Sequence, residues 1–122
     1  MDIESFREYC LSKKGATESF PFDQHTLVFK VGGKMFALTS LDKWEKGDYS
    51  INLKCDPERA LELRSSYTGI LPGYHMSKKH WNTVAVNQDV SLSMVKELID
   101  HSYDLVFGSL TKKIQSGINS GL

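Results

Sequence analysis

Two runs of alternating apolar and polar residues near the middle of the chain predict a β-hairpin. They lie in HTLVFKVGGKMFALTSL, on either side of Gly32 and Gly33, which can adopt the positive φ angles of a two-residue turn. If Val31 pairs with Lys34, one face of the hairpin carries an apolar set: Leu27, Phe29, Phe36 and Leu38. The other face carries a mixed set that we expect to be only partly covered: Thr26, Val28, Lys30, Met35 and Thr39.

The same pattern predicts two further strands and three helices. In YSINLKC, Ile51 and Leu53 alternate with polar residues, and in HWNTVAV the valines face inward while Trp81 faces the other way. Three segments combine a capping residue with apolar residues at helical spacing. They run from about residue 2 to 14, from 57 to about 67 and from 92 to about 108.

The order helix, hairpin, strand, helix, strand, helix is typical of an α+β domain in which helices pack on one face of a mainly antiparallel sheet. We expect one domain, residues 1–118, and a frayed tail, residues 119–122. A strand follows Gly32-Gly33 where a helix would be needed to receive phosphates, so a dinucleotide-binding fold is excluded. The core beneath the helices is expected to contain Phe29, Phe36, Leu53, Val84, Leu98 and Ile99.

Composition narrows the class of protein further. Lys plus Arg and Asp plus Glu both number 15, so any attraction for an anion must come from a local patch. Cys10 and Cys55 form no C-x-x-C pair, and no apolar run is long enough to cross a membrane. We expect a cytoplasmic monomer with free thiols that contacts no membrane.

The loop and strand PGYHMSKKHWNTVAV are the main candidate for a functional site. They lie in a span without acidic residues, from Ser65 to Gln88. Lysines can meet phosphates and aromatic rings can stack on bases, so this segment predicts a small basic and aromatic nucleic-acid contact. The candidate contact residues are Lys34 in the hairpin and Tyr74, His75, Lys78, Lys79, His80 and Trp81 in the loop. The alternative is an anchored turn whose aromatic residues only contact the core.

The same segment offers little for metal binding or catalysis. His75 and His80 have no acid or cysteine nearby to complete a site, and the adjacent lysines would repel a cation. No Gly-x-Ser-x-Gly elbow frames Ser77. Cys10 and Cys55 occupy apolar positions and predict buried, unreactive thiols. We therefore expect no metal, no cofactor and no catalytic residue.

The chain resembles the MmcQ/YjbR family in four segments that follow one another in order. These are FPFDQHTLVFKVGGKMFAL, INLKCDPERALELR, GILPGYHMSKKHWNTV and LIDHSYDLV. The resemblance implies a small α+β domain similar to the frataxin/CyaY type. It also implies DNA binding through a proposed double-wing arrangement, and it supplies no catalytic residues.

Two hypotheses for the function remain open. The first is a DNA-binding module that uses the loop around Lys78 and Lys79 and the hairpin around Lys34 as paired projections. The second is a non-enzymatic protein-interaction or accessory domain that uses the open sheet face. The residues expected on that face are Lys30, Asn52 and Lys54.

Overall fold

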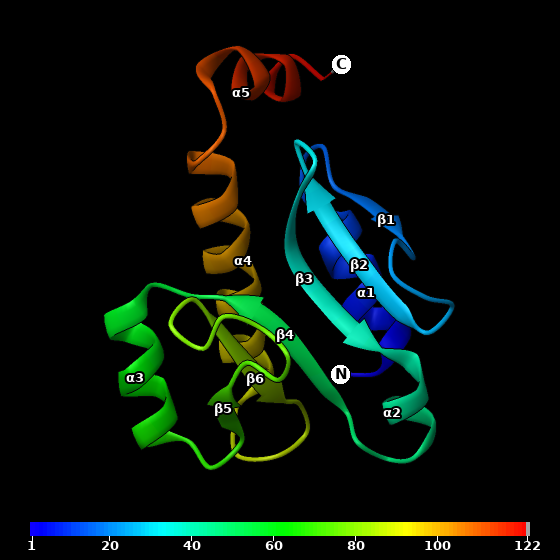
Figure 1. Ribbon diagram of the computed structural model, residues 1–122, viewed down its shortest axis with the longest axis vertical. Helices are drawn as coiled ribbons and strands as arrows, with labels where there is room; N and C mark the ends of the chain where they lie inside the picture. Colours follow the sequence, from blue (N-terminus) through cyan, green and yellow to red (C-terminus); the bar gives the residue numbers. More distant parts are fainter. Residues whose placement is uncertain (122) are drawn as a thin grey trace.

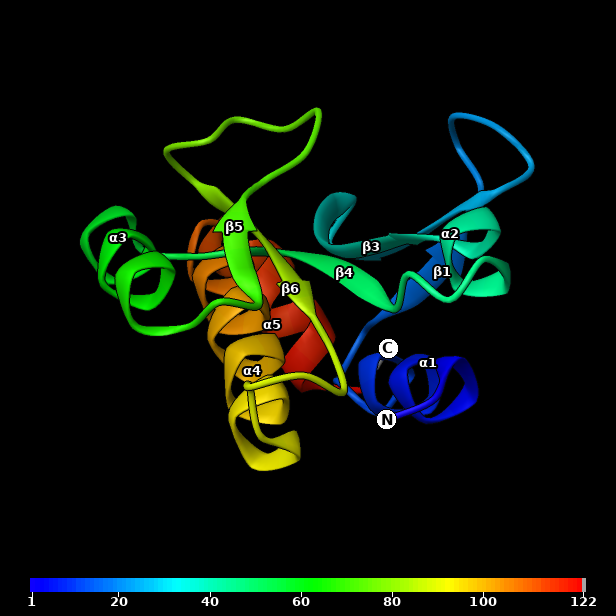
Figure 2. The ribbon, with the colours of Figure 1, turned by 90° about the horizontal axis from the view of Figure 1, so that it is seen from below.

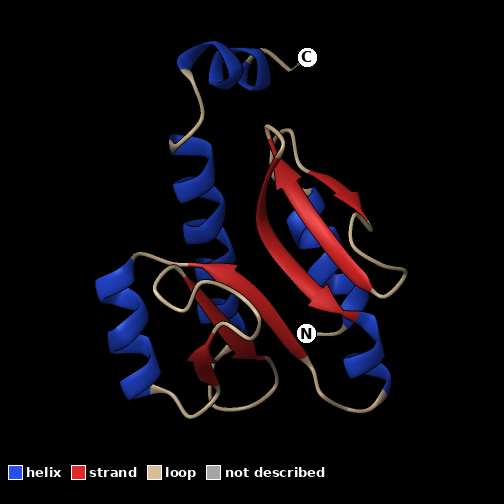
Figure 3. Ribbon diagram, in the orientation of Figure 1, coloured by secondary structure: helices blue, strands red, loops and turns tan. Residues whose placement is uncertain are grey.

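The computed structural model describes residues 1–121, which form one six-stranded antiparallel sheet with helices packed against it (Figures 1 and 3). The strands follow the order β1-β2-β3-β4-β6-β5 across the sheet. This arrangement confirms the predicted α+β fold. Along the chain the elements are α1 (Ile3–Leu11), β1 (Thr17–Ser19), β2 (Thr26–Val31), β3 (Lys34–Ser40), α2 (Leu41–Glu45), β4 (Ser50–Lys54), α3 (Pro57–Ser66), β5 (Ile70–Pro72), β6 (Trp81–Ala85), α4 (Leu92–Gly108) and α5 (Lys112–Asn119).

The helices leave one face of the sheet open. Figure 2 shows α1, α4 and α5 on one side of the strands, while the β1–β2 and β5–β6 loops rise from the other side. We call the uncovered side the open face and the other the helix face. Because one side of the sheet is packed and the other is not, any site on the open face is built from strand side chains and these two loops.

The core lies between the helix face and the helices, where the sequence predicts it. Phe6 packs edge-on against Phe29 at 5.5 Å between ring centroids, and Phe36 packs edge-on against Tyr103 at 5.4 Å. Each of the six residues predicted for the core is buried: Phe29, Phe36, Leu53, Val84, Leu98 and Ile99. Burial of these large side chains supplies most of the driving force for folding.

A β-bulge corrects the predicted faces of the β2–β3 hairpin. Val31 pairs with Lys34 as expected, and Gly32 and Gly33 have positive φ angles of 57° and 81°. Between Phe29 and Lys30 the register shifts by one residue, so Phe36 and Ala37 both lie in the core. A one-residue shift moves every later side chain to the opposite face. The prediction for Leu38 was therefore wrong: it pairs with Val28 and belongs to the open face.

The helix starts follow from the capping residues that the sequence shows. The Asp2 carboxylate accepts a hydrogen bond from the Ser5 N–H at 2.8 Å, and the Asp56 carboxylate accepts one from the Arg59 N–H at 3.1 Å. Four short elements are absent from the predicted order, β1, α2, β5 and α5, and the two strands among them form the edges of the sheet. Residue 119, assigned to a frayed tail, is the last residue of α5, and residue 122 lies outside the described part of the chain.

A serine of α4 joins two strands in the centre of the sheet. Strands β3 and β4 share only two paired positions, Ala37 with Leu53 and Leu38 with Asn52. Beyond them, the Ser102 hydroxyl donates to the Phe36 carbonyl and accepts from the Lys54 N–H at 2.9 Å. The buried hydroxyl thus satisfies one backbone group of each strand where direct pairing has ended.

Candidate functional site

The open face carries lysines and no acidic residue at any strand position of the described chain. The register of the five strand pairs assigns each residue to its face. Lys30 lies opposite Met35, Lys54 opposite Trp81, and Asn52 opposite Thr83. The other residues on this face are Thr17, Ser19, Thr26, Val28, Leu38, Ser40, Ser50, Leu71 and Ala85. The face is therefore basic although the whole protein is neutral.

Arg64 of α3 holds the β5–β6 loop in place over one end of this face. Its guanidinium donates to the carbonyl oxygens of Lys78 and Trp81, and its Nε donates to Asn82 Oδ1 at 2.6 Å. At the other end of the loop, the Gly73 N–H donates to the Trp81 carbonyl at 2.8 Å. The loop therefore has a defined shape, and Lys78, Lys79 and His80 are exposed on it.

Trp81 supports the loop from below. Its side chain is only 8% exposed and packs with Val28 and Leu38, and Met35 and Met76 pack against this cluster. The indole is thus on the face that its alternation predicts, but it is covered in this conformation. A covered ring does not offer a free surface for a base.

Tyr74 is the exposed aromatic residue of the loop. Its side chain is 57% exposed, and the Lys43 ammonium of α2 lies 4.2 Å from the centre of its ring. The His75 ring lies 4.0 Å from the same ring, centre to centre, and His75 has a positive φ of 56°. The Tyr74 N–H also donates to the Thr83 hydroxyl at 3.0 Å. The loop thereby presents an aromatic ring beside two basic side chains.

Lys34 is not brought together with these residues. It pairs with Val31 next to the Gly32-Gly33 turn, on the helix face by register. In Figure 1 this turn lies near the α4–α5 junction, well away from the β5–β6 loop. A β-carbon on Gly32 would lie only 2.6 Å from the Leu110 side chain, so the turn packs tightly there.

The second projection on the open face is the β1–β2 loop, residues 20–25, which is not among the predicted site residues (Figure 2). Asp23 fixes it by accepting hydrogen bonds from the His25 N–H at 2.8 Å and the Thr26 N–H at 2.6 Å. These N–H groups lower the pKa of Asp23. The signal in the sequence was FPFDQH, in which two aromatic residues flank a proline and an aspartate turn follows. In this loop the Phe22 side chain is 65% exposed.

A hollow of about 590 Å³ lies between the two loops, above the centre of the open face. This volume is within the range of small-ligand sites. Phe22 and Tyr74 come from opposite loops, and the lining is both apolar and polar. The lining residues are Phe22, Thr26, Met35, Leu38, Thr39, Ser40, Lys43, Ser50, Asn52, Tyr74, His75, Met76 and Ser77.

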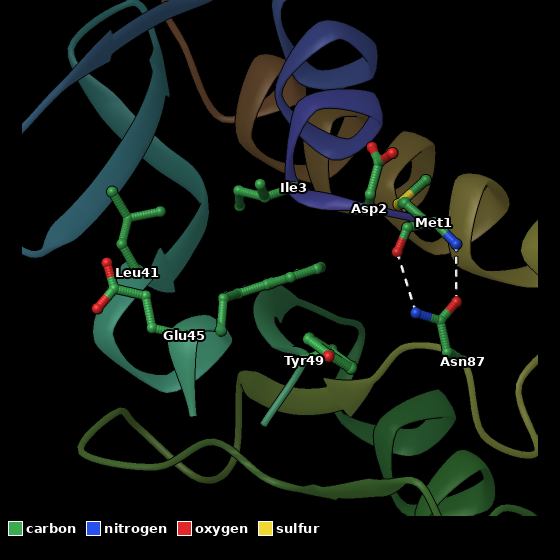
Figure 4. Close-up of a pocket in the computed structure, with 8 residues that line it drawn as sticks. Met1, Asp2, Ile3, Leu41, Glu45, Tyr49 and Asn87 are labelled. Atoms are coloured by element: carbon green, nitrogen blue, oxygen red, sulfur yellow. Dashed lines mark hydrogen bonds between the residues drawn. The ribbon is translucent and has the colours of Figure 1, made fainter. Parts of the chain in front are cut away.

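A second hollow, of about 750 Å³, lies near the start of α1 (Figure 4). The figure shows the Met1 backbone joined to the Asn87 side chain by two hydrogen bonds, at 2.7 and 3.1 Å. Among the described residues that line it are the acids Asp2 and Glu45 and no lysine or arginine. An anionic ligand is therefore better matched by the hollow on the open face.

Three features of the described chain concern thiol chemistry, metal binding and membrane spanning. Burial raises the pKa of the Cys55 thiol to about 11, and it raises the pKa of Cys10 still further. Both thiols are free and buried, so they are poor nucleophiles. Within residues 1–121, no three His, Cys, Asp or Glu side chains gather in a way that could hold a metal ion. None of the described helices is long and apolar enough to cross a membrane.

The fold and the site define an α+β domain with a helix-covered antiparallel sheet and a basic open face flanked by two loops. The YjbR family model matches residues 11–105, and the chain belongs to this family. YbdF of Escherichia coli, an uncharacterized protein, is 40% identical over 102 residues, which are 84% of this chain and 81% of YbdF. YjbR of Escherichia coli, also uncharacterized, is 32% identical over 103 residues, 84% of this chain and 85% of YjbR.

Solved structures of similar proteins have the same fold. The Deinococcus radiodurans protein DR2400, a DUF419 domain, superimposes with a TM-score of 0.89 at 38% identity and covers 97% of this chain and 88% of its own. A Pseudomonas syringae protein superimposes with a TM-score of 0.72 at 28% identity, over 87% of this chain and 99% of its own.

Proposed function

We propose that this protein is a non-enzymatic nucleic-acid-binding module that contacts DNA weakly and with little dependence on sequence. The contact surface is the β5–β6 loop together with the open face. The observation that carries the proposal is the charge of this side of the molecule, where strand lysines and loop lysines lie on the same side as the exposed rings of Phe22 and Tyr74 and no strand position of the open face is acidic.

Two acids lie near this surface, Asp23 in the β1–β2 loop and Asp42 in α2. Asp23 accepts hydrogen bonds from its own loop, and Asp42 lies 3.1 Å from His25 Nδ1. Many acids instead lie on α1, α3 and α4, on the helix side and the flank of the sheet, where some pair with arginine: Glu4, Glu8, Glu58, Glu62, Glu97, Asp100 and Asp104. The open side thus carries fewer acids than the helix side, so phosphates would meet less repulsion there.

Affinity is expected to be low and to depend strongly on salt. Each phosphate that a lysine neutralises releases counterions, and few lysines lie on this surface. Lysines that contact phosphates carry no sequence information, and stacking on an aromatic ring accepts every base. The surface thus suits general contact with a strand rather than recognition of a particular site.

The test is a salt titration of binding to labelled single-stranded and double-stranded DNA. Replacing Lys78 and Lys79 with alanine should weaken binding and reduce the slope of log affinity against log salt by about 1.4 to 1.8. Lys112 and Lys113 of α5 form a matched control, because they are also adjacent and exposed. Equal loss in both double variants, or no salt-dependent binding by the wild type, would contradict the proposal.

A protein-interaction or accessory domain is the second candidate, and the lining of the hollow favours it. Met35, Leu38 and Met76 give the hollow an apolar part, and methionine side chains adapt easily to the shape of a partner. A photo-crosslinking amino acid at position 74 separates the two candidates. In cells it would attach to nucleic acid in the first case and to polypeptide in the second.

A further inference from the structure

Two exposed aromatic side chains line the hollow on the open face. Phe22 from the β1–β2 loop and Tyr74 from the β5–β6 loop both line it, and they are 65% and 57% exposed. Neither ring is in stacking contact with the other, since the close partners of Tyr74 are His75 and Lys43. A planar group that enters the hollow can contact the apolar surface of both side chains.

The floor of the hollow adds hydrogen-bonding groups to this apolar surface. The Thr83 hydroxyl donates to Asn52 Oδ1 at 2.6 Å, which leaves the Asn52 NH₂ group as a donor without a partner in the described chain. Ser50 also lines the floor. Apolar walls with a few polar groups at the base are typical of a site that orients a small planar ligand.

The charge around the hollow selects an anionic ligand. Lys43 lines it, and Lys30, Lys54, Lys78 and Lys79 lie on the same side of the sheet or on the adjoining loop. A base with its phosphate combines a planar ring, edge acceptors and a negative charge. The aromatic side chains match the planar ring, Asn52 and Ser50 match the edge acceptors, and the lysines match the negative charge.

We propose that the hollow holds one unstacked base of a single-stranded nucleic acid while the neighbouring phosphates contact the lysines of the open face. This inference rests on the proposed function and adds a base-binding site to it. It makes Tyr74 and Phe22 the residues that hold the base and leaves Trp81 to support the loop.

The experiment compares a ten-nucleotide thymidine strand with an abasic strand of the same length and charge, by fluorescence anisotropy at low salt. The wild type should bind the thymidine strand roughly 5- to 150-fold more tightly, as expected for stacking of one base. Tyr74→Ala and Phe22→Ala should each reduce this ratio and leave the salt slope unchanged. Tyr49→Ala is the matched control, because Tyr49 is 42% exposed but lines the other hollow.

The outcomes separate the inference from the function on which it rests. Equal, salt-dependent binding of both strands by the wild type would refute the base site and leave the proposed function standing. A preference for thymidine that survives both Tyr74→Ala and Phe22→Ala would refute the base site as well. Failure to bind either strand would overturn the base site, and failure to bind double-stranded DNA as well would overturn both proposals. Thermal melting of each variant confirms that its fold is intact.

Discussion

Gly73 is a position where a single methyl group should disturb the β5–β6 loop. A β-carbon added there would lie 2.8 Å from the Trp81 Cβ, 3.0 Å from the Trp81 carbonyl oxygen and 3.1 Å from the Met76 Cβ. Two of these three atoms are the first carbon of a side chain and the third is backbone, so rotation of a flexible group cannot relieve the contacts. Gly73 is also buried and donates its N–H to the Trp81 carbonyl at 2.8 Å.

We expect Gly73→Ala to lower the free energy of unfolding by about 1–3 kcal/mol, the usual cost of adding a methyl group to a packed site. With a urea dependence of about 2 kcal/mol/M, the midpoint of unfolding should fall by about 0.5–1.5 M. Tryptophan fluorescence provides a second measurement, because displacement of the loop would expose Trp81, now 8% exposed, and shift its emission to longer wavelength.

Gly108→Ala is the matched control for this substitution. Gly108 ends α4, and an added β-carbon would meet nothing within 4 Å. Since alanine favours a helix more than glycine does, this variant should be as stable as the wild type or more stable by up to about 1 kcal/mol. If Gly73→Ala unfolds at the wild-type urea concentration with unchanged emission, the loop does not have the packing described for it.

Three further substitutions test the core, the sheet and a half-buried histidine. Phe36→Ala should cost about 3–5 kcal/mol in urea unfolding, because the ring is fully buried; a loss below about 1 kcal/mol would mean that the bulge is wrongly placed. Ser102→Ala should cost about 1–3 kcal/mol, since it leaves the Phe36 carbonyl and the Lys54 N–H unsatisfied, and a neutral result would show that water or new pairing replaces the hydroxyl. Burial, and then the charge of Arg59, lower the pKa of His101, which accepts a hydrogen bond from the Asp56 N–H at 3.1 Å. The contribution of His101 to stability should therefore be present above its unfolded pKa of about 6.5 and lost as the pH falls through its folded pKa. Urea midpoints of wild type and His101→Gln should therefore differ less at about pH 5 than at about pH 7.5, and a constant difference would contradict the assignment.

The parts of the fold that the sequence predicts are those with strong local signals. Glycines at the hairpin turn, Asp56 before Pro57, and the long apolar stripe of α4 each fix a structure within a few residues. The bulge at Phe36 was not predictable, because the residues from Lys34 to Ser40 also fit the alternation of a regular strand. The edge strands β1 and β5 are three residues long, too short for an alternating pattern to stand out.

The candidate site was predictable only where its residues are close in sequence. The β5–β6 loop contains its own basic and aromatic residues, and these were recognised together. The β1–β2 loop, residues 20–25, lies far away in the chain and lines the same hollow only because both loops rise from one sheet. Lys43 reaches Tyr74 from α2, an element that was not predicted at all. Lys34 was predicted to lie with the β5–β6 loop and lies elsewhere, because the sequence gives no distance across a sheet.

The uneven distribution of charge on the two sides of the sheet has a consequence at long range. A protein with no net charge has little net attraction to a polyanion. Separated positive and negative charges nevertheless give it a dipole, and a dipole in the field of a polyanion experiences a torque. If the protein binds such a polymer as proposed, its open face should turn toward the polymer before the two touch, over a distance of about one Debye length, roughly 8 Å at physiological salt. Orientation of this kind increases the fraction of productive collisions without strengthening the final complex.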